Sequence, residues 1–267
     1  MLRAALVVLL LALTGCSGVS RVTGGSTDTD APSATEARKP PVLGACRSLA
    51  RGDIDRVSND SATVPCAARH TAETFAVGTF PPTVAAKGMT SAALGAYVYR
   101  RCHPQFQRFV GADQSLVLRS TLTWAWFRSP SAGWKAGGHT WRCDVVGEDA
   151  PSKELVALPR TARGLLLGKP DDRWLVCVDG PTVTGSLKIA CSRTHTWRAV
   201  TTVVLGKAGD AYPGDRLSEV RTRDYCSGSV GAWMNYPVDY DYGYTWFHAA
   251  EWKAGNRRSI CWAKTAQ

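Results

Sequence analysis

The sequence twice places a histidine four positions after a cysteine, in Cys66-Ala-Ala-Arg-His70 and in Cys191-Ser-Arg-Thr-His195. Thiolate and imidazole are preferred zinc ligands, so a metal site is one interpretation of this pattern. A zinc site needs four ligands, however, and the thiols of an exported protein are readily oxidised to disulfides. We therefore predict no metal and no other cofactor. We expect His70 and His195 to hydrogen-bond to backbone at a strand end.

The number of cysteines favours disulfides. Cys16 ends an N-terminal leader, and the chain's other eight cysteines are Cys46, Cys66, Cys102, Cys143, Cys177, Cys191, Cys226 and Cys261. An even number in an exported protein indicates four disulfides. Four cysteines in each half allow three connectivities. A hairpin that places Cys177 opposite Cys191 favours first-to-second pairing, and a first-to-fourth bridge across a sheet is the alternative.

No arrangement of residues typical of a hydrolase occurs in the sequence. It contains no Gly-x-Ser-x-Gly, no His-Glu-x-x-His and no glycine-rich phosphate loop. Its carboxylates are scattered, and the densest run, Asp239 to Tyr244, lies in one half only. We therefore expect a protein that is not an enzyme.

That acidic run carries an aromatic stripe. At the period of a strand, one face bears Tyr240, Tyr242, Tyr244 and Trp246. One interpretation is an aromatic core face. The other is an exposed platform for a glycan or a partner protein, for which tyrosine and tryptophan supply rigid contact area. Burial of the stripe distinguishes the two.

The first sixteen residues, MLRAALVVLLLALTGC, predict export. Arg3 precedes an apolar run of about ten residues, which suits a signal peptide and is too short to span a bilayer. Leu13 to Cys16 resembles the bacterial lipoprotein signal, in which the cysteine is lipidated and becomes the new N-terminus. The alternative is an ordinary secretory signal with a chance cysteine. Two or three acyl chains on Cys16 would anchor the chain stably to a membrane.

The domain organisation follows from composition and repeats. Residues 1–15 are the predicted signal peptide, and residues 16–41, rich in Ser, Thr, Gly, Asp and Pro, are a flexible tether. Two copies of one module follow, at 42–147 and 174–267, joined by a linker at 148–173. The cysteine intervals are 20, 36 and 41 in the first copy and 14, 35 and 35 in the second. The segments TWAWF and GYTWF match, and WKAG recurs nine residues before each copy's last cysteine.

Each copy is predicted to be a small α+β module with an antiparallel sheet and one main helix. A hairpin holds the first two cysteines, and a strand follows at AETFAVGTF or RAVTTVVLG. The helix comes next. Ser91 caps the first helix, which Pro104 should kink or break, and Asp215 caps the second, which presents Leu217 and Trp233. Two strands complete the copy, with a turn at Gly137 or Gly255 following the Trp-Lys-Ala segment. Within the linker, RTARGLLLG is expected to form a short helix on the second module.

The pattern resembles the septum formation family of actinobacterial lipoproteins and membrane proteins. The resemblance rests on LGAC at 43–46, VPCAARH at 64–70, Cys102, and WKAG leading to Cys143, and it covers roughly residues 42–264. The second copy matches through Cys191, His195, Cys226, Trp252 and Cys261. Arg69 and Thr194 stand where the family usually has proline. The resemblance implies a role associated with cell division in the envelope and specifies no reaction or ligand.

Together these features predict a non-catalytic lipoprotein, lipid-anchored on the extracytoplasmic face of the cell membrane, that acts as a binding or scaffolding element near the growing wall or septum. The net charge of +10 favours anionic neighbours. Expected partners are the membrane and an envelope protein or cell-wall polymer. Nucleic acid is not expected, since the basic residues are spread and the leader directs export. The alternative function is a module that binds cell-wall glycan or anionic polymer through the Tyr240 to Trp246 face.

Overall fold

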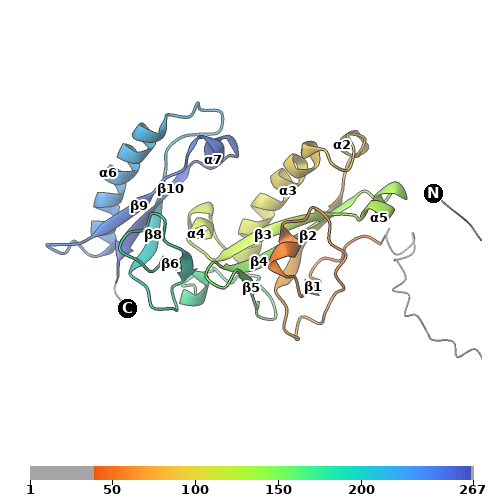
Figure 1. The fold of residues 1–267 in the computed structure, drawn as a ribbon, viewed down its shortest axis with the longest axis horizontal. Coiled ribbons are helices and arrows are strands. Elements are labelled where there is room, and N and C mark those ends of the chain that lie inside the picture. Colours follow the sequence, from red (N-terminus) through yellow and green to blue (C-terminus); the bar gives the residue numbers. More distant parts are fainter. Residues whose placement is uncertain (1–38, 266–267) are drawn as a thin grey trace, which may run out of the picture. The chain divides into compact units, whose positions relative to one another are not determined.

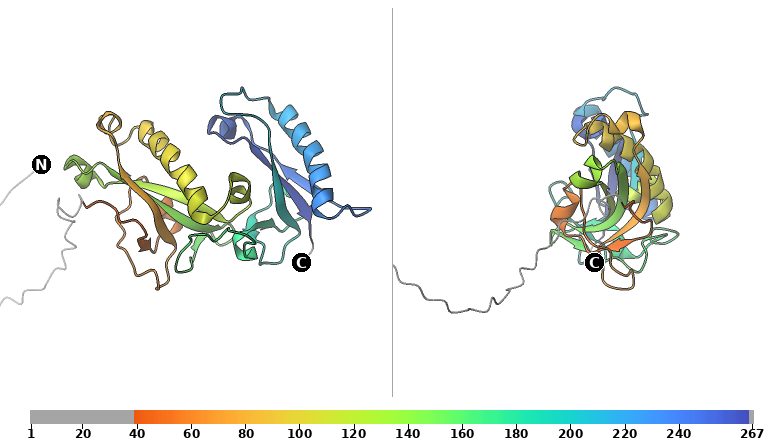
Figure 2. Two further views of the ribbon diagram at one scale, coloured as in Figure 1. Left: turned by 180° about the vertical axis from the view of Figure 1, so that it is seen from behind. Right: turned by 90° about the vertical axis from the view of Figure 1, so that its right-hand side faces the viewer.

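The computed structural model describes residues 39–265, which form an α+β fold with two antiparallel sheets. We call residues 39–174 the first half and residues 175–265 the second half. One long helix covers one face of each sheet (Figures 1 and 2). The two sheets are joined along the chain through the predicted linker.

The first sheet has the strand order β1-β2-β4-β3, with β5 paired to β4. Its strands are β1 (Cys46–Arg47), β2 (Ala72–Thr79), β3 (Leu122–Arg128), β4 (Thr140–Asp149) and β5 (Glu154–Val156). The helices of this half are α1 (Arg51–Ile54), α2 (Pro82–Ala85), α3 (Ala92–Val110), α4 (Gln114–Leu118) and α5 (Ser131–Lys135), and it ends in the 3-10 turn η2 (Asp172–Trp174). The long helix α3 packs on β2 and β4 around an aromatic core that includes Phe75, Phe106 and Trp141.

The second sheet has the order β7-β6-β8-β10-β9. Its strands are β6 (Val176–Val178), β7 (Lys188–Ala190), β8 (Trp197–Val204), β9 (Tyr242–Thr245) and β10 (Arg258–Lys264), and its helices are α6 (Asp215–Trp233) and α7 (Ala249–Lys253). In both sheets the strand that carries the last cysteine lies between two neighbours, and the strand that precedes it in the sequence forms an edge.

Helix α3 confirms the predicted helix cap at Ser91. The Ser91 hydroxyl accepts a hydrogen bond from Ala93 N at 3.3 Å, and Gly111 ends the helix in a left-handed conformation with φ of 77°. Pro104 was expected to kink or break the helix, and it does not break it, because helix geometry continues for the full 19 residues. Packing of Leu94, Val98, Cys102 and Phe106 against the sheet offsets the lost hydrogen bond.

Helix α6 differs from its prediction. Gly214 occupies the N-cap position without a side-chain bond, and Asp215 is the first helical residue. Leu217 and Trp233, expected on the buried face, are exposed at 40% and 50%. The buried face is instead small and partly polar, with Ser218, Thr222, Cys226, Val230 and Gly231. Few apolar side chains therefore hold α6 to its sheet.

The four predicted disulfides form, with first-to-second and third-to-fourth pairing in each half. The bonds are Cys46–Cys66, Cys102–Cys143, Cys177–Cys191 and Cys226–Cys261. Two of them close a local loop before the long helix. The other two link the long helix of each half to β4 or β10.

The local hairpins differ from the predictions in register and form. Cys177 lies opposite Ile189, not Cys191, and its disulfide reaches Cys191 diagonally along the neighbouring strand. In the first half the predicted hairpin is reduced to the bridge between Cys46 and Val64, and α1 occupies part of the expected turn. The disulfide can therefore close this loop without a regular ladder.

The two Trp-Lys-Ala-Gly segments form one-turn helices, where a plain strand-to-strand turn was expected. Trp134 lies in α5 and Trp252 in α7, and both indoles are buried. Gly137 and Gly255 follow with φ of 87° and 105°. Only glycine adopts such angles without strain, which explains its place in both copies.

The predicted linker belongs to the first half. Strand β5 pairs with β4, while Leu158, Ala162 and Leu166 enter the first core. The expected helix at RTARGLLLG is wrong: these residues make turns, and Leu166 N donates to Val110 O at 2.9 Å at the end of α3. The segment satisfies carbonyls that the helix end leaves free.

A buried charge network lies in the first half. Asp144 is fully buried, accepts from Arg142 Nε at 2.9 Å and from the Thr74 hydroxyl at 2.7 Å, and lies 4.0 Å from Arg47. Arg142 also donates to the Asn59 carbonyl and side chain. Burial, with the nearby Arg142, lowers the pKa of Arg47, and Asp144 opposes that shift. The network joins β1, β2 and β4 to the loop before β2.

Replacing both cysteines of a helix-to-strand disulfide by alanine tests how each helix is held. The two loops, of 41 and 35 residues, have nearly equal closure entropy, about 4 kcal/mol each. Any difference therefore reports packing. We expect the loss of Cys226–Cys261 to release α6, so that its amides are much less protected from hydrogen exchange. The amides of α3 should stay protected after the loss of Cys102–Cys143. Equal loss of protection in both helices would contradict this account.

Candidate binding groove along strand β9

The four residues of the predicted aromatic stripe lie together in the second half. Tyr240 precedes β9, Tyr242 and Tyr244 lie within it, and Trp246 follows, because the strand ends at Thr245. Successive ring centroids are 6.4, 6.4 and 5.9 Å apart. The stripe is therefore a continuous row of rings.

The row is half-buried, between the two alternatives that the sequence left open. The three tyrosines pack against the core that contains Cys226 and Cys261, under α6. The Tyr240 hydroxyl donates to Ser227 O at 2.8 Å, and Gly231 leaves room for this ring, since a Cβ there would lie 2.7 Å from the hydroxyl oxygen. The rings thus form part of the core and also one wall of a surface groove.

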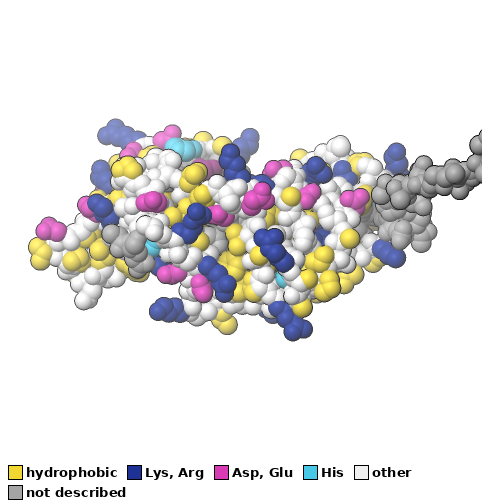
Figure 3. All heavy atoms as spheres, turned by 60° about the horizontal axis from the view of Figure 1, so that its bottom comes forward, with side chains coloured by type: hydrophobic (Ala, Val, Ile, Leu, Met, Phe, Trp, Pro, Cys, Tyr) yellow, Lys and Arg dark blue, Asp and Glu magenta, His cyan; other side chains and the backbone are white. Residues whose placement is uncertain are grey.

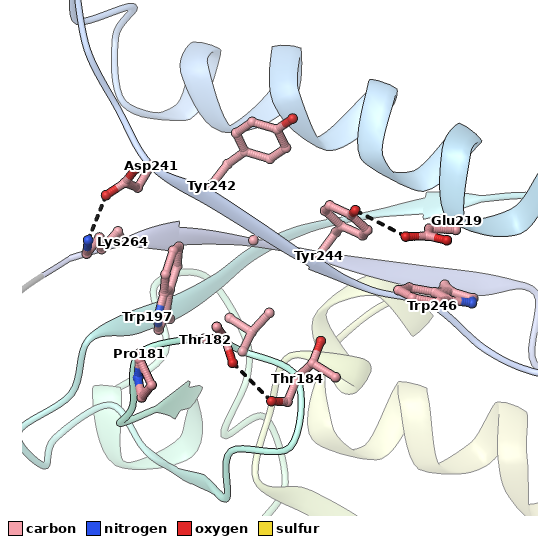
Figure 4. Close-up of a pocket in the computed structure, with 12 residues that line it drawn as sticks. Pro181, Thr182, Thr184, Trp197, Glu219, Asp241, Tyr242, Tyr244, Trp246 and Lys264 are labelled. Carbon is pink, nitrogen blue, oxygen red and sulfur yellow. Dashed lines mark hydrogen bonds and ion pairs between the residues drawn. The ribbon is translucent and has the colours of Figure 1, made fainter. Parts of the chain in front are cut away.

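The groove runs along β9 and has a volume of about 470 Å³ (Figure 4). We call it the β9 groove. Its lining comes from the loop 181–184, from Trp197, Glu219, Asp241, Tyr242, Gly243 and Tyr244, and from Trp246 and Lys264. Figure 4 shows β9 passing between the α6 side, where Tyr244 faces Glu219, and the loop with Thr182 and Thr184. Strand, helix and loop together therefore shape the groove.

The loop wall is fixed by close packing at Gly243. A Cβ on Gly243 would lie 3.0 Å from both methyl groups of Val183, so the loop approaches the strand as closely as glycine permits. Val183 also belongs to the core beside Trp197 and Trp262. The wall is therefore anchored to the sheet.

Charge in the groove is distributed unevenly. Lys264 Nζ lies 2.7 Å from Asp241 Oδ2, so these two charges neutralise each other. Glu219 accepts from the Tyr244 hydroxyl at 3.4 Å and makes no ion pair within residues 39–265. Burial and, secondarily, the charge of Glu219 raise the pKa of Tyr244. Arg223, on the next turn of α6, opposes that shift and forms its own ion pair with Asp224. Within residues 39–265, the groove thus combines aromatic walls with one carboxylate that makes no ion pair.

The two histidines of the Cys-x-x-x-His segments have the predicted structural role. Both are buried, and their Nδ1 atoms lie 2.8 Å from Ala68 O and 2.7 Å from Arg193 O. The cysteines before them are in disulfides. Among residues 39–265, no three His, Cys, Asp or Glu side chains are grouped so that they could hold a metal ion.

A second polar cluster was missed from the sequence. The Tyr212 hydroxyl donates to Asp215, and His248 Nδ1 lies 2.9 Å from the same carboxylate oxygen. These hydrogen bonds, first from Tyr212 and then from His248, lower the pKa of Asp215. The bond to Asp215 raises the pKa of His248. His248 has no counterpart in the first half, so the repeat gave no signal for it, and Trp246 links it to the β9 groove at a ring distance of 5.8 Å.

Other lining residues were also missed. Alternation along β10 from the buried Cys261 places Lys264 on the sheet face away from α6, a signal that the sequence contains. Glu219 and the loop 181–184 meet β9 only through tertiary packing. Cys16, the predicted lipidation site, lies outside the described residues.

The fold and the four disulfides define a disulfide-stabilised α+β protein. The chain belongs to the septum formation family, whose model matches residues 43–261. This membership connects the protein with cell division and the cell envelope. No curated protein and no solved structure matches the chain significantly.

Two further features of the described residues concern apolar helices and surface charge. Over residues 39–265, no helix is long and apolar enough to cross a membrane. Basic and acidic side chains are interspersed on the face in Figure 3. On that face, the positive charge is therefore spread out.

The Asp215–His248 pair predicts a pH response. The raised pKa of His248 means that its stabilising contribution is present at low pH and lost as pH rises through the folded-state pKa. The lowered pKa of Asp215 means that its contribution is lost as pH falls through its own pKa. The pair is therefore strongest between these pKa values. We expect Asp215→Asn to lower the pKa of His248, measured by NMR titration of the imidazole, whereas Tyr212→Phe leaves it raised. An unchanged His248 pKa in Asp215→Asn would refute the pairing.

Proposed function

We propose that this protein is a non-catalytic, lipid-anchored element of the cell envelope that binds a component of the growing wall or septum in the β9 groove. The groove is the observation that carries the proposal, because it combines Tyr242, Tyr244 and Trp246 with polar groups at its margins. Membership of the septum formation family supports the envelope and division setting. The leader ending at Cys16 supports the anchor.

We further propose that the chain contains two divergent copies of one module. Each half places its long helix over an antiparallel sheet and links that helix by a disulfide to the strand bearing the last cysteine. Each also has a one-turn helix with a buried tryptophan before that strand. Shared local details of this kind are expected from duplication.

The non-catalytic part of the proposal rests on the sequence, which has none of the hydrolase motifs considered above. The Asp215–His248 pair is the nearest approach to a catalytic dyad. Its side chains are 62% and 61% exposed, and a reaction site usually excludes water. We interpret the pair as support for the end of the β9 groove.

A second candidate is binding of cell-wall glycan or anionic polymer at the same place. The observation that favours it is the row from Tyr240 to Trp246, because aromatic rings and polar margins suit a sugar chain. The tyrosines are half-buried, so such a ligand would contact the edges of the rings more than their faces.

The anchor is tested by replacing its cysteine. In detergent phase partition of the full-length protein produced in its own host, we expect the natural chain in the detergent phase and Cys16→Ser in the aqueous phase, because the variant lacks acyl chains. Intact mass under non-reducing conditions should show four disulfides in both, which controls for folding. Retention of Cys16→Ser in the detergent phase would exclude lipidation at this residue.

Binding at the groove is tested in living cells. A photoreactive residue at Thr184, on the exposed loop wall, should crosslink to an envelope component on irradiation. The matched control carries the same residue at Glu154, which is exposed in the first half. Mass spectrometry identifies the adducts. Identical adducts at both positions, or none at Thr184, would argue against the groove as the binding site.

A further inference from the structure

The outer side of β9 has no partner strand among the described residues. Lys264 N donates to Asp241 O at 3.2 Å, and the register pairs Gly243 with Trp262 and Thr245 with Ile260. Backbone groups of an antiparallel strand alternate in direction. The N–H and C=O groups of Tyr242 and Tyr244 therefore point away from β10, towards the unpaired edge.

This edge is the floor of the β9 groove. The α6 side carries Glu219 on one flank, and the loop 181–184 forms the other. Figure 4 shows β9 between these flanks. Donors and acceptors two residues apart recur at roughly 7 Å along a strand. The groove thus offers a row of backbone groups at the repeat of an extended polypeptide.

In the first half, an extended segment covers the end of the corresponding edge strand, at its last residue, Arg128. Arg128, at the end of β3, donates its N–H to Val57 O at 2.9 Å, and Ser58 forms a parallel bridge with it. TWAWF in β3 and GYTWF at β9 are the matching segments of the two halves. In the second half, no described segment takes the place of Val57 and Ser58.

We propose that the β9 groove binds an extended polypeptide segment of a partner protein as an added strand on β9, with a basic side chain of the segment facing Glu219. This proposal rests on the proposed function in using the same groove, and it adds the class of ligand. Backbone bonds to Tyr242 and Tyr244 supply affinity, and side-chain pockets supply selectivity.

Charge identifies the basic side chain. Glu219 is half-buried and makes no ion pair within residues 39–265, whereas Lys264 is engaged by Asp241. A lysine or arginine beside Glu219 would also meet the rings of Tyr244 and Trp246, where cation–π attraction adds to the ion pair.

The shape of the groove favours a single extended segment over other occupants. A second copy of this chain would have to bring its own edge strand between α6 and the loop, together with the flanks of that strand. A sugar chain could contact the rings but would not match the repeat of backbone groups. An isolated extended segment matches the repeat and brings no flanking strands.

The test uses the purified full-length protein in detergent micelles and a phage-displayed library of nine-residue peptides. Bound peptide should slow hydrogen exchange of the Tyr242 and Tyr244 amides at least about tenfold and leave those of Gly243 and Thr245, already bonded to β10, unchanged. N-methylation of alternate peptide residues should distinguish two sets of peptide N–H groups, those that face β9 and those that face away from it. Methylation of the set facing β9 should weaken peptide binding about tenfold or more. Methylation of the other set should weaken it less than about threefold.

Protein variants supply the second arm. Glu219→Gln should weaken the binding of basic peptides severalfold, and the exposed control Glu154→Gln should leave their binding unchanged. Strand addition is overturned if no selected peptide protects the two amides, or if they are already protected in a self-associated form, as a second copy would cause. It is also overturned if an N-acetylglucosamine tetramer perturbs the groove without protecting them, an outcome that retains groove binding. If neither probe perturbs the groove, its binding role fails too, independently of the anchor.

Discussion

The disulfide between Cys226 and Cys261 is the constraint on which the second half depends. Helix α6 buries only Cys226 and Val230 as sizeable apolar side chains, and the rest of its inner face is small or hydroxyl-bearing. The helix itself therefore transfers little apolar area from water, and much of the apolar contact beneath it comes from the tyrosine rings. The covalent link to β10, which lies between β8 and β9, adds to this packing. Because Glu219 and the covering of the tyrosine rings belong to α6, the α6 wall of the β9 groove depends on this one bond.

The two halves use the same frame with different cores. In the first half, α3 contributes Leu94, Val98, Phe106 and Phe109 to a large apolar cluster, and turns from the predicted linker extend it. In the second half, tyrosines with one polar end occupy the space between helix and sheet. Such rings can be half-buried at little cost, since their hydroxyls reach Ser227 O or Glu219 at the surface. The half-buried tyrosines therefore account both for the less apolar core of the second half and for the aromatic wall of the groove.

The sequence predicted features set by local pattern. The start of α3 follows from its cap at Ser91, and the four disulfides follow from an even cysteine count. Features set by tertiary contacts were missed. Leu166 enters the first core because α3 ends beside it, and Cys177 pairs diagonally because the hairpin register differs. Neither periodicity nor spacing encodes such contacts.

The same limit explains which residues of the candidate site could be predicted from the sequence. The row from Tyr240 to Trp246 was visible from alternation, but Glu219 and Val183 join it from elements far away in the sequence. The buried Asp144 network was invisible for a similar reason: Arg142 and Asp144 look like the exposed face of a strand until the loop at Asn59 covers them. Charged residues at alternate strand positions therefore indicate one shared face, and only the fold decides whether that face meets water.

The open edge of β9 requires a physical explanation, because unpaired strand edges promote aggregation. Proteins commonly protect them with a covering segment, and the last residue of β3, Arg128, is bonded to one at Val57. The edge of β9 is instead recessed between α6 and the loop that Val183 fixes to Gly243. On the proposal of strand addition, such a recess would exclude the edge of another folded sheet and admit a lone extended chain. On that proposal, the same two walls would protect the edge from self-association and select the kind of segment that can pair with it.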